Sequence, residues 1–467
     1  MQKSWKHGKV FYQRKQPGNQ LMTEILALLQ IINQSVLDTT TRKRLAIVVL
    51  AMLAMAGRIT MRGISRWTET GGSYRTIQRL FNTKIEWSQL MVIFVAIWFA
   101  DAEDIFLLAG DETVITKAGK QTHGLDRFFS SIFGRPIKGL AFLAFSLVSV
   151  KQRKAYPIRM EQLTKEKALC GKRKKKAKTE KKAKKKGQRG RPKGSKNKNR
   201  RDVELPEHLQ QMQVWLKGTL RLLEIVGMPI IYFMFDGAFG NNNSLQMVQQ
   251  CGLHLISKLR RDSALYFPFT GKQKKHGARR KYGSKLDYDQ IPDNCLVSTE
   301  TVDKIRTHIY QMQMWHKLFP DKLNIVIVRK INLENGKWAH VVLFSSDLAL
   351  AADKLVDYYR LRFQIEFNFR DAKQFWGLED FMNIRQQPVH NFANLSMFMV
   401  TVAQQLIQQR RGNIPNFGIN DLKAEFRGRK YASELLKLLP ETLNELLIDD
   451  FFAKIGVLGR INAPLSS

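Results

Sequence analysis

The amino-acid sequence predicts a mixed α/β protein, and three observations support this class. Residues from about 21 to 100 carry apolar side chains at helical spacing. From Asp104 onward, continuous apolar runs indicate strands that are buried on both faces of a sheet. At 467 residues, the chain is too long for one small core. We therefore expect two or three domains, with helical regions beside a central sheet.

The charge balance predicts a polyanionic partner. The chain has 77 Lys and Arg residues against 40 Asp and Glu residues, which gives a net charge of +37. An excess of this size is typical of proteins that bind nucleic acid.

Other features exclude several classes of protein. The three cysteines are far apart and lack CxxC spacing, so we expect reduced thiols and no zinc site. The longest apolar run, residues 45–57, is shorter than the roughly 20 residues that a membrane-spanning helix needs. Residues 1–15 lack the apolar core of a signal peptide. We therefore expect a cytoplasmic protein that has no membrane partner and lies beside nucleic acid.

The N-terminal region, residues 1–100, contains a candidate helix-turn-helix at 60–84. Thr60 and Ser73 stand where the N-caps of two short helices are expected, and a Gly-Gly pair lies in the turn. Arg75 and Arg79 would share one face of the second helix and contact DNA there. Short helices around a glycine turn also occur in ordinary helical bundles, so both interpretations stay open.

The segments after residue 104 predict the order strand, strand, strand, helix, strand, helix, strand. A β-rich stretch from about 264 to 348 and a further helix come next. The most regular of these segments are the predicted strands IFLLAGDETVIT, GLAFLAFSLVSV and AYPIRMEQL, the predicted helix LPEHLQQMQVWLKGTLRLLEIVG, and the predicted strands MPIIYFMFDGAFG and LHLISKLR.

Residues 165–201 form a basic low-complexity run. It holds 20 Lys and Arg residues against two Glu residues, so it supplies +18 of the net charge. Like charges at this density do not pack, which predicts a disordered loop that binds phosphates regardless of base sequence. Arg189 and Arg191 lie in an Arg-Gly-Arg-Pro sequence that resembles the core of an AT-hook, a minor-groove binding segment. A merely solvating basic tract is the alternative interpretation.

Three carboxylates occupy positions from which we expect them to converge on one edge of the sheet. Asp111 lies at the end of the first apolar strand, Asp236 closes a later strand, and Glu366 projects from the helix at 357–381. Each of them taken alone is most simply a cap or an ion-pair partner. Three converging carboxylates need cations to stay ionised, and Mg²⁺ is the expected metal because it prefers oxygen ligands; we expect Mn²⁺ to substitute for it. Two such ions suit an in-line phosphoryl transfer.

The helix that carries Glu366 has a polar stripe among aromatic residues. At about 100° per residue, Tyr359, Arg362, Glu366 and Lys373 point in similar directions. Their spacing, Tyr-x2-Arg-x3-Glu-x6-Lys, resembles the signature of the IS4-like DDE transposases of bacterial insertion sequences. GDET at Asp111 and FDGAFG at residues 235–240 resemble the two aspartate motifs of that group. The resemblance extends over residues 104–381.

The resemblance implies an RNase H-like catalytic core with a β-rich insertion domain. We expect the core at 101–260 and 347–400, with the basic loop 165–201 inside it. The insertion would span 261–346, and a helical C-terminal region would span 401–467. In that last region, leucines at helical spacing predict either core packing or a subunit contact.

The resemblance also implies roles for individual residues. The catalytic metal ligands would be Asp111, Asp236 and Glu366, while phosphates of the DNA end would be held by Tyr359, Arg362 and Lys373. Trp315 and Trp338 of the insertion are candidates for stacking on a base flipped out of the duplex. Packing in the core of the insertion is the alternative for both tryptophans.

The expected protein is therefore a DNA transposase. It would bind the terminal inverted repeats of an insertion sequence, cleave them with Mg²⁺ and join the 3′-OH ends to target DNA. Its partner would be double-stranded DNA in the bacterial nucleoid, and pairing of two ends implies a homodimer. An RNase H-like nuclease that cleaves without joining is one alternative, and a transposase-derived DNA-binding protein without catalysis is the other.

Overall fold

The computed structural model describes residues 18–30, 36–68, 71–130, 133–165, 200–201, 203–438, 445–457 and 460–461. Nearly all of the basic run at 165–201 lies outside these residues, and so do Arg189 and Arg191. The disordered loop and the AT-hook therefore stay predictions.

The chain divides into two compact units, each described by itself below. The helical unit comprises Met1–Phe99, Gln121–His123 and Arg370–Ser467. The sheet unit comprises Ala100–Lys120 and Gly124–Phe369. The N-terminal and C-terminal helical regions expected from the sequence thus both contribute to the helical unit.

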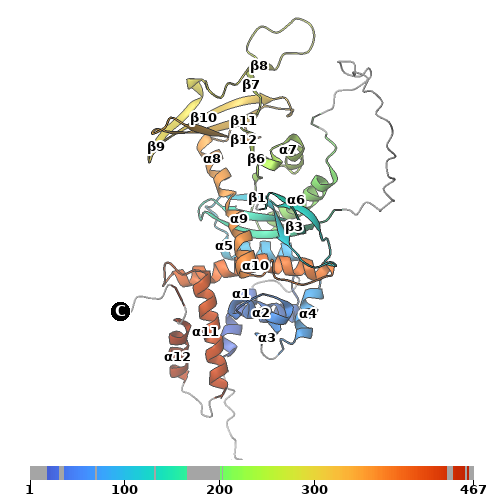
Figure 1. The fold of residues 1–467 in the computed structure, drawn as a ribbon, viewed down its shortest axis with the longest axis vertical. Coiled ribbons are helices and arrows are strands. Elements are labelled where there is room, and N and C mark those ends of the chain that lie inside the picture. The colour runs from blue at the N-terminus through green and yellow to red at the C-terminus, as the bar shows by residue number, and fades with distance from the viewer. Residues whose placement is uncertain are drawn as a thin grey trace, which may run out of the picture. The chain divides into compact units, whose positions relative to one another are not determined.

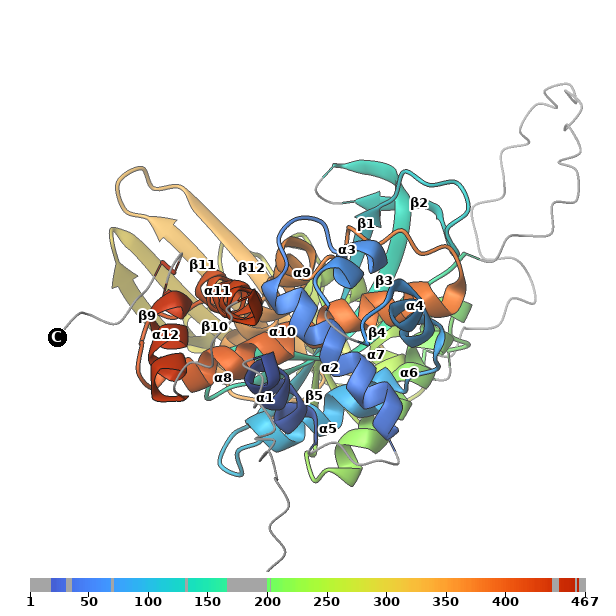
Figure 2. The same ribbon diagram turned by 90° about the horizontal axis from the view of Figure 1, so that it is seen from below.

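The helical unit is organised around one long and largely buried helix, α10. Most of α10 is buried from Pro388 to Ile407, and it contacts α4, α5 and α11 (Figures 1 and 2). Phe392 of α10 stacks on Phe81 of α4 with 5.0 Å between ring centroids. The helices of this unit are α1 (Gly18–Gln30), α2 (Thr39–Ala54), α3 (Met61–Arg66), α4 (Tyr74–Asn82), α5 (Trp87–Phe99), α10 (Gln386–Arg411), α11 (Ile419–Leu438) and α12 (Glu445–Val457).

The two predicted N-caps at 60–84 are confirmed. The Thr60 hydroxyl accepts a hydrogen bond from the Gly63 amide at 3.0 Å, and the Ser73 hydroxyl accepts one from the Thr76 amide at 3.3 Å. These side chains satisfy amides that the first turns of α3 and α4 leave without a helical partner.

No single described helix is both long enough and apolar enough to cross a membrane. The pair α4 and α5 meets that test only when taken together, and the two helices are bent by 95° at their junction. The apolar run at 45–57 lies largely in α2, where most of its side chains are buried against other helices of the unit.

The sheet unit is built on one hydrogen-bonded mixed sheet. Its strand order is β2-β3-β1-β5-β6-β12-β11-β10-β7-β8, while β4 pairs with β3 and β9 pairs with β10. The first group of strands comprises β1 (Phe106–Thr116), β2 (Asp126–Ser130), β3 (Arg135–Ser149), β4 (Lys154–Leu163), β5 (Tyr232–Met234) and β6 (His254–Leu259). The second group comprises β7 (Leu265–Pro268), β8 (Tyr282–Lys285), β9 (Leu296–Val302), β10 (Ile305–His316), β11 (Leu323–Asn332) and β12 (Trp338–Ser345).

The helices of this unit follow the predicted alternation with strands. Between β4 and β6 lie α6 (Glu207–Ile225) and α7 (Asn242–Gln249), on either side of β5. Figure 1 shows α6 beside the β1 and β3 end of the sheet. Strand β2 was not predicted, because it is short and largely exposed and has no continuous apolar run.

The strands of the predicted insertion join the sheet through β12. This strand pairs antiparallel with β6, with Val342 opposite Leu259, so the hydrogen-bonded ladder continues from β6 into β12, β11 and β10. The β-rich character expected for this stretch is confirmed.

Two local expectations were wrong. Asp111 is not at a strand end, because β1 continues to Thr116 in antiparallel pairing with β3. The segment 357–381 is not one helix but α8 (Ala352–Leu361) followed by α9 (Gln364–Phe375). At the break, the amides of Phe363, Ile365 and Glu366 bond to carbonyls three residues earlier, which is the tighter pattern of a 3₁₀ turn. The 100° spacing therefore does not hold across Arg362.

Candidate active site

The pairing register of two parallel strands brings Asp111 and Asp236 to the same level. Ala109 of β1 is opposite Met234 of β5, and each aspartate follows two residues later. Beyond this point β5 has ended while β1 continues, so both carboxylates lie where β1 loses its parallel neighbour. The Asp236 side chain accepts a hydrogen bond from the Ala238 amide at 3.0 Å, which holds it at the start of a short 3₁₀ turn.

Gly110 allows this close approach of β1 and β5. A Cβ atom at this position would lie 2.7 Å from the Phe235 ring and 2.8 Å from the Phe233 ring. Those two rings pack edge to face with 4.6 Å between centroids. Any larger residue before Asp111 would push these rings away and change the spacing of the two aspartates.

Side chains from α8 and α9 fix the third carboxylate over the sheet. On α8, the Tyr358 ring packs against Tyr232 of β5 with 5.7 Å between centroids. On α9, the buried Asn368 amide donates to the Ser146 hydroxyl of β3 at 3.2 Å. Glu366 is half a turn before Asn368 on the same helix, so this buried hydrogen bond fixes the height of Glu366 above the strands.

Arg362 joins the carboxylates of two distant segments. Its Nη1 atom donates to Asp111 Oδ2 at 3.2 Å, and its Nη2 atom donates to Glu366 Oε1 at 3.2 Å. The guanidinium is largely buried, with 12% of its side-chain surface exposed. The break between α8 and α9 places Arg362 in the turn, from which its side chain reaches both β1 and α9.

The site keeps more negative charge than Arg362 neutralises. Burial, together with the nearby charges of Asp236 and Glu366, raises the pKa of Asp111 to about 6 even though Arg362 opposes the shift. Loss of hydration and the negative charges of Asp111 and Asp236 raise the pKa of Glu112 to about 7, although the residue as a whole is exposed. Both shifts indicate that another cation would be favourable here.

The residues of this site fit a divalent cation in chemistry but are not arranged around one. Carboxylate oxygens are the ligands that Mg²⁺ and Mn²⁺ prefer. Among the described residues, no three Asp, Glu, His or Cys side chains lie close enough together to hold a metal ion as they stand. Arg362 lies between two of the three carboxylates, and its buried Nε atom has no hydrogen-bond partner among the described residues. We infer that Arg362 takes a place that the cation and the substrate would share.

Sequence reasoning missed three residues beside the aspartates. Glu112 is adjacent to Asp111, and its amide donates to Asp111 Oδ1 at 2.8 Å. The Ser257 hydroxyl donates to the Asp236 carbonyl at 2.8 Å, and the Lys258 side chain lies against Gly237. Glu112 was visible within the GDET motif, but only the pairing of β5 with β6 brings residues 257 and 258 here.

The other two members of the stripe have different surroundings. The Tyr359 ring lies near the Arg362 guanidinium at 5.8 Å, and burial raises the pKa of its hydroxyl. Lys373 is further along α9, in the part that belongs to the helical unit, where it pairs with Glu379 at 3.6 Å.

The remaining described residues that the sequence predicted lie on other elements. In the helical unit, Arg75 and Arg79 are exposed on α4, on the face opposite the buried Ile77. In the sheet unit, Trp315 packs edge to face with Tyr282, and Lys281 lies 5.0 Å above its ring. Trp338 is 37% exposed, with the Arg329 guanidinium 3.9 Å from its ring centroid.

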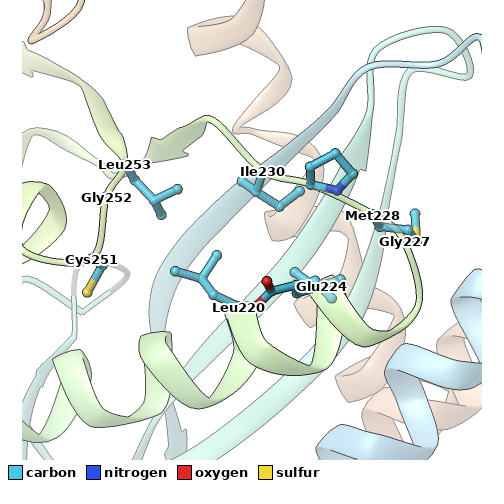
Figure 3. A pocket seen from close by; sticks show the side chains of 10 residues that line it. Leu220, Glu224, Gly227, Met228, Ile230, Cys251, Gly252 and Leu253 are labelled. Atoms are coloured by element: carbon cyan, nitrogen blue, oxygen red, sulfur yellow. The ribbon is translucent and has the colours of Figure 1, made fainter.

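A pocket of about 410 Å³ lies elsewhere in the sheet unit (Figure 3). It is bounded by the last turns of α6 and the segment before β6, and none of the three candidate carboxylates lines it. Burial raises the pKa of Cys251 in its wall to about 11, so this thiol stays protonated at neutral pH. A protonated thiol is a poor nucleophile, so we do not include Cys251 in the candidate active site.

Comparison with known protein families supports a nuclease. Residues 29–319 match a family model described as DDE superfamily endonuclease. The matched region includes Asp111 and Asp236 and ends before α8 and α9. A comparison with curated proteins gave no match.

Proposed function

The chain belongs to the DDE superfamily endonucleases, and from this membership we propose that it is a transposase of the IS4-like DDE group. The family implies DNA as substrate and a divalent metal ion as the usual cofactor. The observation that carries the finer assignment is the bridge from Arg362 to Asp111 and Glu366. It joins the first aspartate motif to the helix motif across 251 positions of sequence.

The strand order supports an RNase H-like core within this fold. From β4 through β3 to β1 the strands are antiparallel, and from β1 through β5 to β6 they are parallel. Each aspartate comes two residues after the last residue that pairs β1 with β5, and the glutamate comes from a helix after the last strand. We propose that β7 to β12 are the β-rich insertion that such transposases carry between the second Asp and the Glu.

We propose Asp111, Asp236 and Glu366 as the ligands of Mg²⁺, which Mn²⁺ would replace. The bound ion would supply Lewis-acid activation of the attacking oxygen and stabilisation of the leaving oxygen. Arg362 would turn from the carboxylates to a phosphate of the DNA end, because a guanidinium donates to two phosphate oxygens at once. Tyr359 and Lys373 would contact the same backbone.

The proposed reaction has two phosphoryl transfers and no covalent protein intermediate. A water oxygen first attacks the phosphodiester at the end of the element, and the 3′-oxygen leaves as a 3′-OH. That 3′-OH then attacks a phosphodiester of the target DNA, and a target 3′-OH leaves. Asp111, Asp236 and Glu366 would hold the metal ion, and Arg362 would orient the reacting phosphate.

We assign DNA binding outside the active site to other parts of the chain. Arg75 and Arg79 on the exposed face of α4 would contact the terminal inverted repeats. Arg189 and Arg191 in the basic run would contact the minor groove. Trp338 is a better candidate than Trp315 to stack on a flipped base, because Trp338 is 37% exposed and Trp315 is less exposed. A homodimer on DNA, in the nucleoid, completes the proposal.

The test is a cleavage and joining assay with purified full-length protein. Duplexes carrying the ends of the element are incubated with Mg²⁺ and a supercoiled target plasmid, with Asp236→Asn as the matched control. The expected products are free 3′-OH ends and joined plasmid. Cleavage without joined product would favour the RNase H-like nuclease, and specific binding without either product would favour the DNA-binding protein that has lost catalysis.

A further inference from the structure

The hairpin of β7 and β8 ends in a long connecting loop (Figure 1), and we call the hairpin together with its loop, residues 265–285, the β7 to β8 ribbon. The Phe269 amide donates to the Lys281 carbonyl at 3.1 Å. Further out, the Gln273 side chain donates to the Arg280 carbonyl at 2.9 Å and accepts from the Arg280 amide at 2.8 Å. Three hydrogen bonds thus join the two arms of the loop and give it a defined conformation.

All charged residues of this ribbon are cations. No Asp or Glu occurs between Leu265 and Leu286. All residues from Gly271 to Lys281 are exposed, and no carboxylate in the described part of the chain pairs with their cations. The cations are arranged three on the outgoing arm and three on the returning arm, namely Lys272, Lys274 and Lys275, then Arg279, Arg280 and Lys281.

The neighbouring turns of the same sheet are different. The β9 to β10 turn contains both Asp303 and Lys304, and Lys304 pairs with Glu334 of the β11 to β12 turn at 2.6 Å. Those turns therefore neutralise their own charges. The unpaired charge of the β7 to β8 ribbon is not a general property of loops in this part of the protein.

Aromatic rings at the base of the ribbon hold some of the cations. The Arg280 guanidinium lies 4.5 Å above Phe269, and the Lys281 ammonium lies 5.0 Å above Trp315. In the turn that follows β10, the Lys317 ammonium lies 4.7 Å above Tyr266. A ring face attracts a cation without using up its N–H donors. Arg280 Nε donates to the Tyr282 carbonyl at 3.1 Å, which leaves its two Nη groups and the two ammonium groups to bind an anion.

We propose that the ribbon at residues 265–285 is a sequence-independent binding element for double-stranded DNA. A two-stranded ribbon fits the major groove, which is bordered by phosphates on both sides. Cations on both arms match these two rows of phosphates, and phosphate contacts carry no base sequence information. The ribbon is therefore suited to DNA of variable sequence, such as the target. This inference rests on the proposed function in taking DNA as the polyanion.

The test measures DNA binding without cleavage. Full-length protein in EDTA is titrated with duplexes of random sequence over a range of NaCl concentrations. The variant Lys272→Gln/Lys274→Gln/Lys275→Gln is compared with Lys304→Gln/Lys330→Gln/Lys337→Gln, which removes the same charge from exposed positions of neighbouring strands and turns. Each lost phosphate contact lowers the salt slope of log K by about 0.9. We expect the slope of the ribbon variant to fall by about 2 to 3 and its affinity to fall at least about tenfold, with a change below about 1 in slope for the control.

Three outcomes would overturn the proposal. One is an unchanged slope in the ribbon variant, and another is an equal loss in both variants. The third is a larger loss with single-stranded RNA of the same length than with duplex DNA. Because the assay contains no metal ion, these results are independent of cleavage. A parent protein that never cleaves DNA would refute the transposase proposal while leaving a ribbon effect intact.

Discussion

Two charge clusters, one in each unit, are built from arginines and carboxylates but differ in the balance of the two. In the helical unit, Arg410 donates to Glu24 at 2.7 Å and to Glu425 at 3.1 Å, and Arg460 donates to Glu425 at 2.8 Å. Arg429 lies 3.5 Å from both glutamates. In this cluster the cations outnumber the carboxylates, and each carboxylate has at least two of them as partners.

In the sheet unit the ratio is reversed. Arg362 is the arginine that contacts Asp111 and Glu366, while Asp236 and Glu112 add further negative charge nearby. A cluster with matched partners holds helices together, since removing any member leaves a buried charge. A cluster with surplus carboxylate is destabilising by itself and gains from an added cation. We therefore interpret the first cluster as structural and propose the second as functional.

The largest expected effect is on catalysis at Asp236. Asp236→Asn removes one carboxylate ligand but keeps the hydrogen bond acceptor for Ala238, so the fold should not change. We expect end cleavage to fall at least a thousandfold, which is ~4 kcal/mol in the barrier, with an unchanged melting temperature. The measurement is single-turnover cleavage in Mg²⁺ beside a thermal melt. Cleavage at the parental rate would remove Asp236 from the proposed site.

The complementary effect is on stability at Glu425. Glu425→Gln leaves Arg410 and Arg460 largely buried with reduced compensation, and loss of one partner of a buried pair costs about 3 kcal/mol or more. Denaturant unfolding of the full chain measures this change. Glu366→Gln is the matched control in the sheet unit, and we expect it to cost less than about 1 kcal/mol. An equal loss in both variants would contradict the distinction between the two clusters.

Removing surplus charge should stabilise the sheet unit in a pH-dependent way. The pKa of Asp111 is about 6 in the folded protein against a usual value of 3.8. Between these values the folded state holds a proton that the unfolded state has lost, so stability falls as pH rises through this window. Asp111→Asn should therefore gain up to about 3 kcal/mol at pH 7 in EDTA, with little gain near pH 3. Unfolding at the two pH values measures this, and a loss of stability at pH 7 would contradict it.

The smallest expected effect concerns the shape of the Arg362 cation. Lysine is a point charge and cannot reach Asp111 and Glu366 together as the guanidinium does. We expect Arg362→Lys to lower end cleavage about tenfold, or ~1.4 kcal/mol, and to increase the rise in melting temperature on adding Ca²⁺. The larger rise follows because the metal would then meet less competition for the carboxylates. A rise in melting temperature on adding Ca²⁺ that equals the rise of the parent protein would mean that Arg362 and the metal ion do not compete for the same carboxylates.

Much of this architecture could be predicted from the sequence. The apolar runs predicted β1, β3, β4 and β6, because strands buried on both faces must be apolar throughout. Thr60 and Ser73 were readable as caps, since the hydroxyl bonds to an amide only three residues away. The spacing of Arg362 and Glu366, on which their proposed roles depend, is also a local property of the sequence.

Other features could not be predicted from the sequence, because they depend on pairing between distant segments. The break at Arg362 shows no proline or glycine, and in the fold it lies where one guanidinium reaches both β1 and α9. The neighbourhood of Asp236 includes Ser257 and Lys258 only because β5 pairs with β6. The aromatic support of the β7 to β8 ribbon requires the register of Trp315 against Tyr266.

By itself, the sequence determined the residue types and their local order: the net charge of +37, the aspartate and glutamate motifs, and the all-cationic run at 271–281. Tertiary structure alone decided which charges are matched. Glu425 and Asp111 are both carboxylates in largely buried positions, yet three arginines surround Glu425 and one contacts Asp111. The reason is physical: a burial cost and a Coulomb interaction depend on distances through space, and those distances are set when remote helices and strands pack.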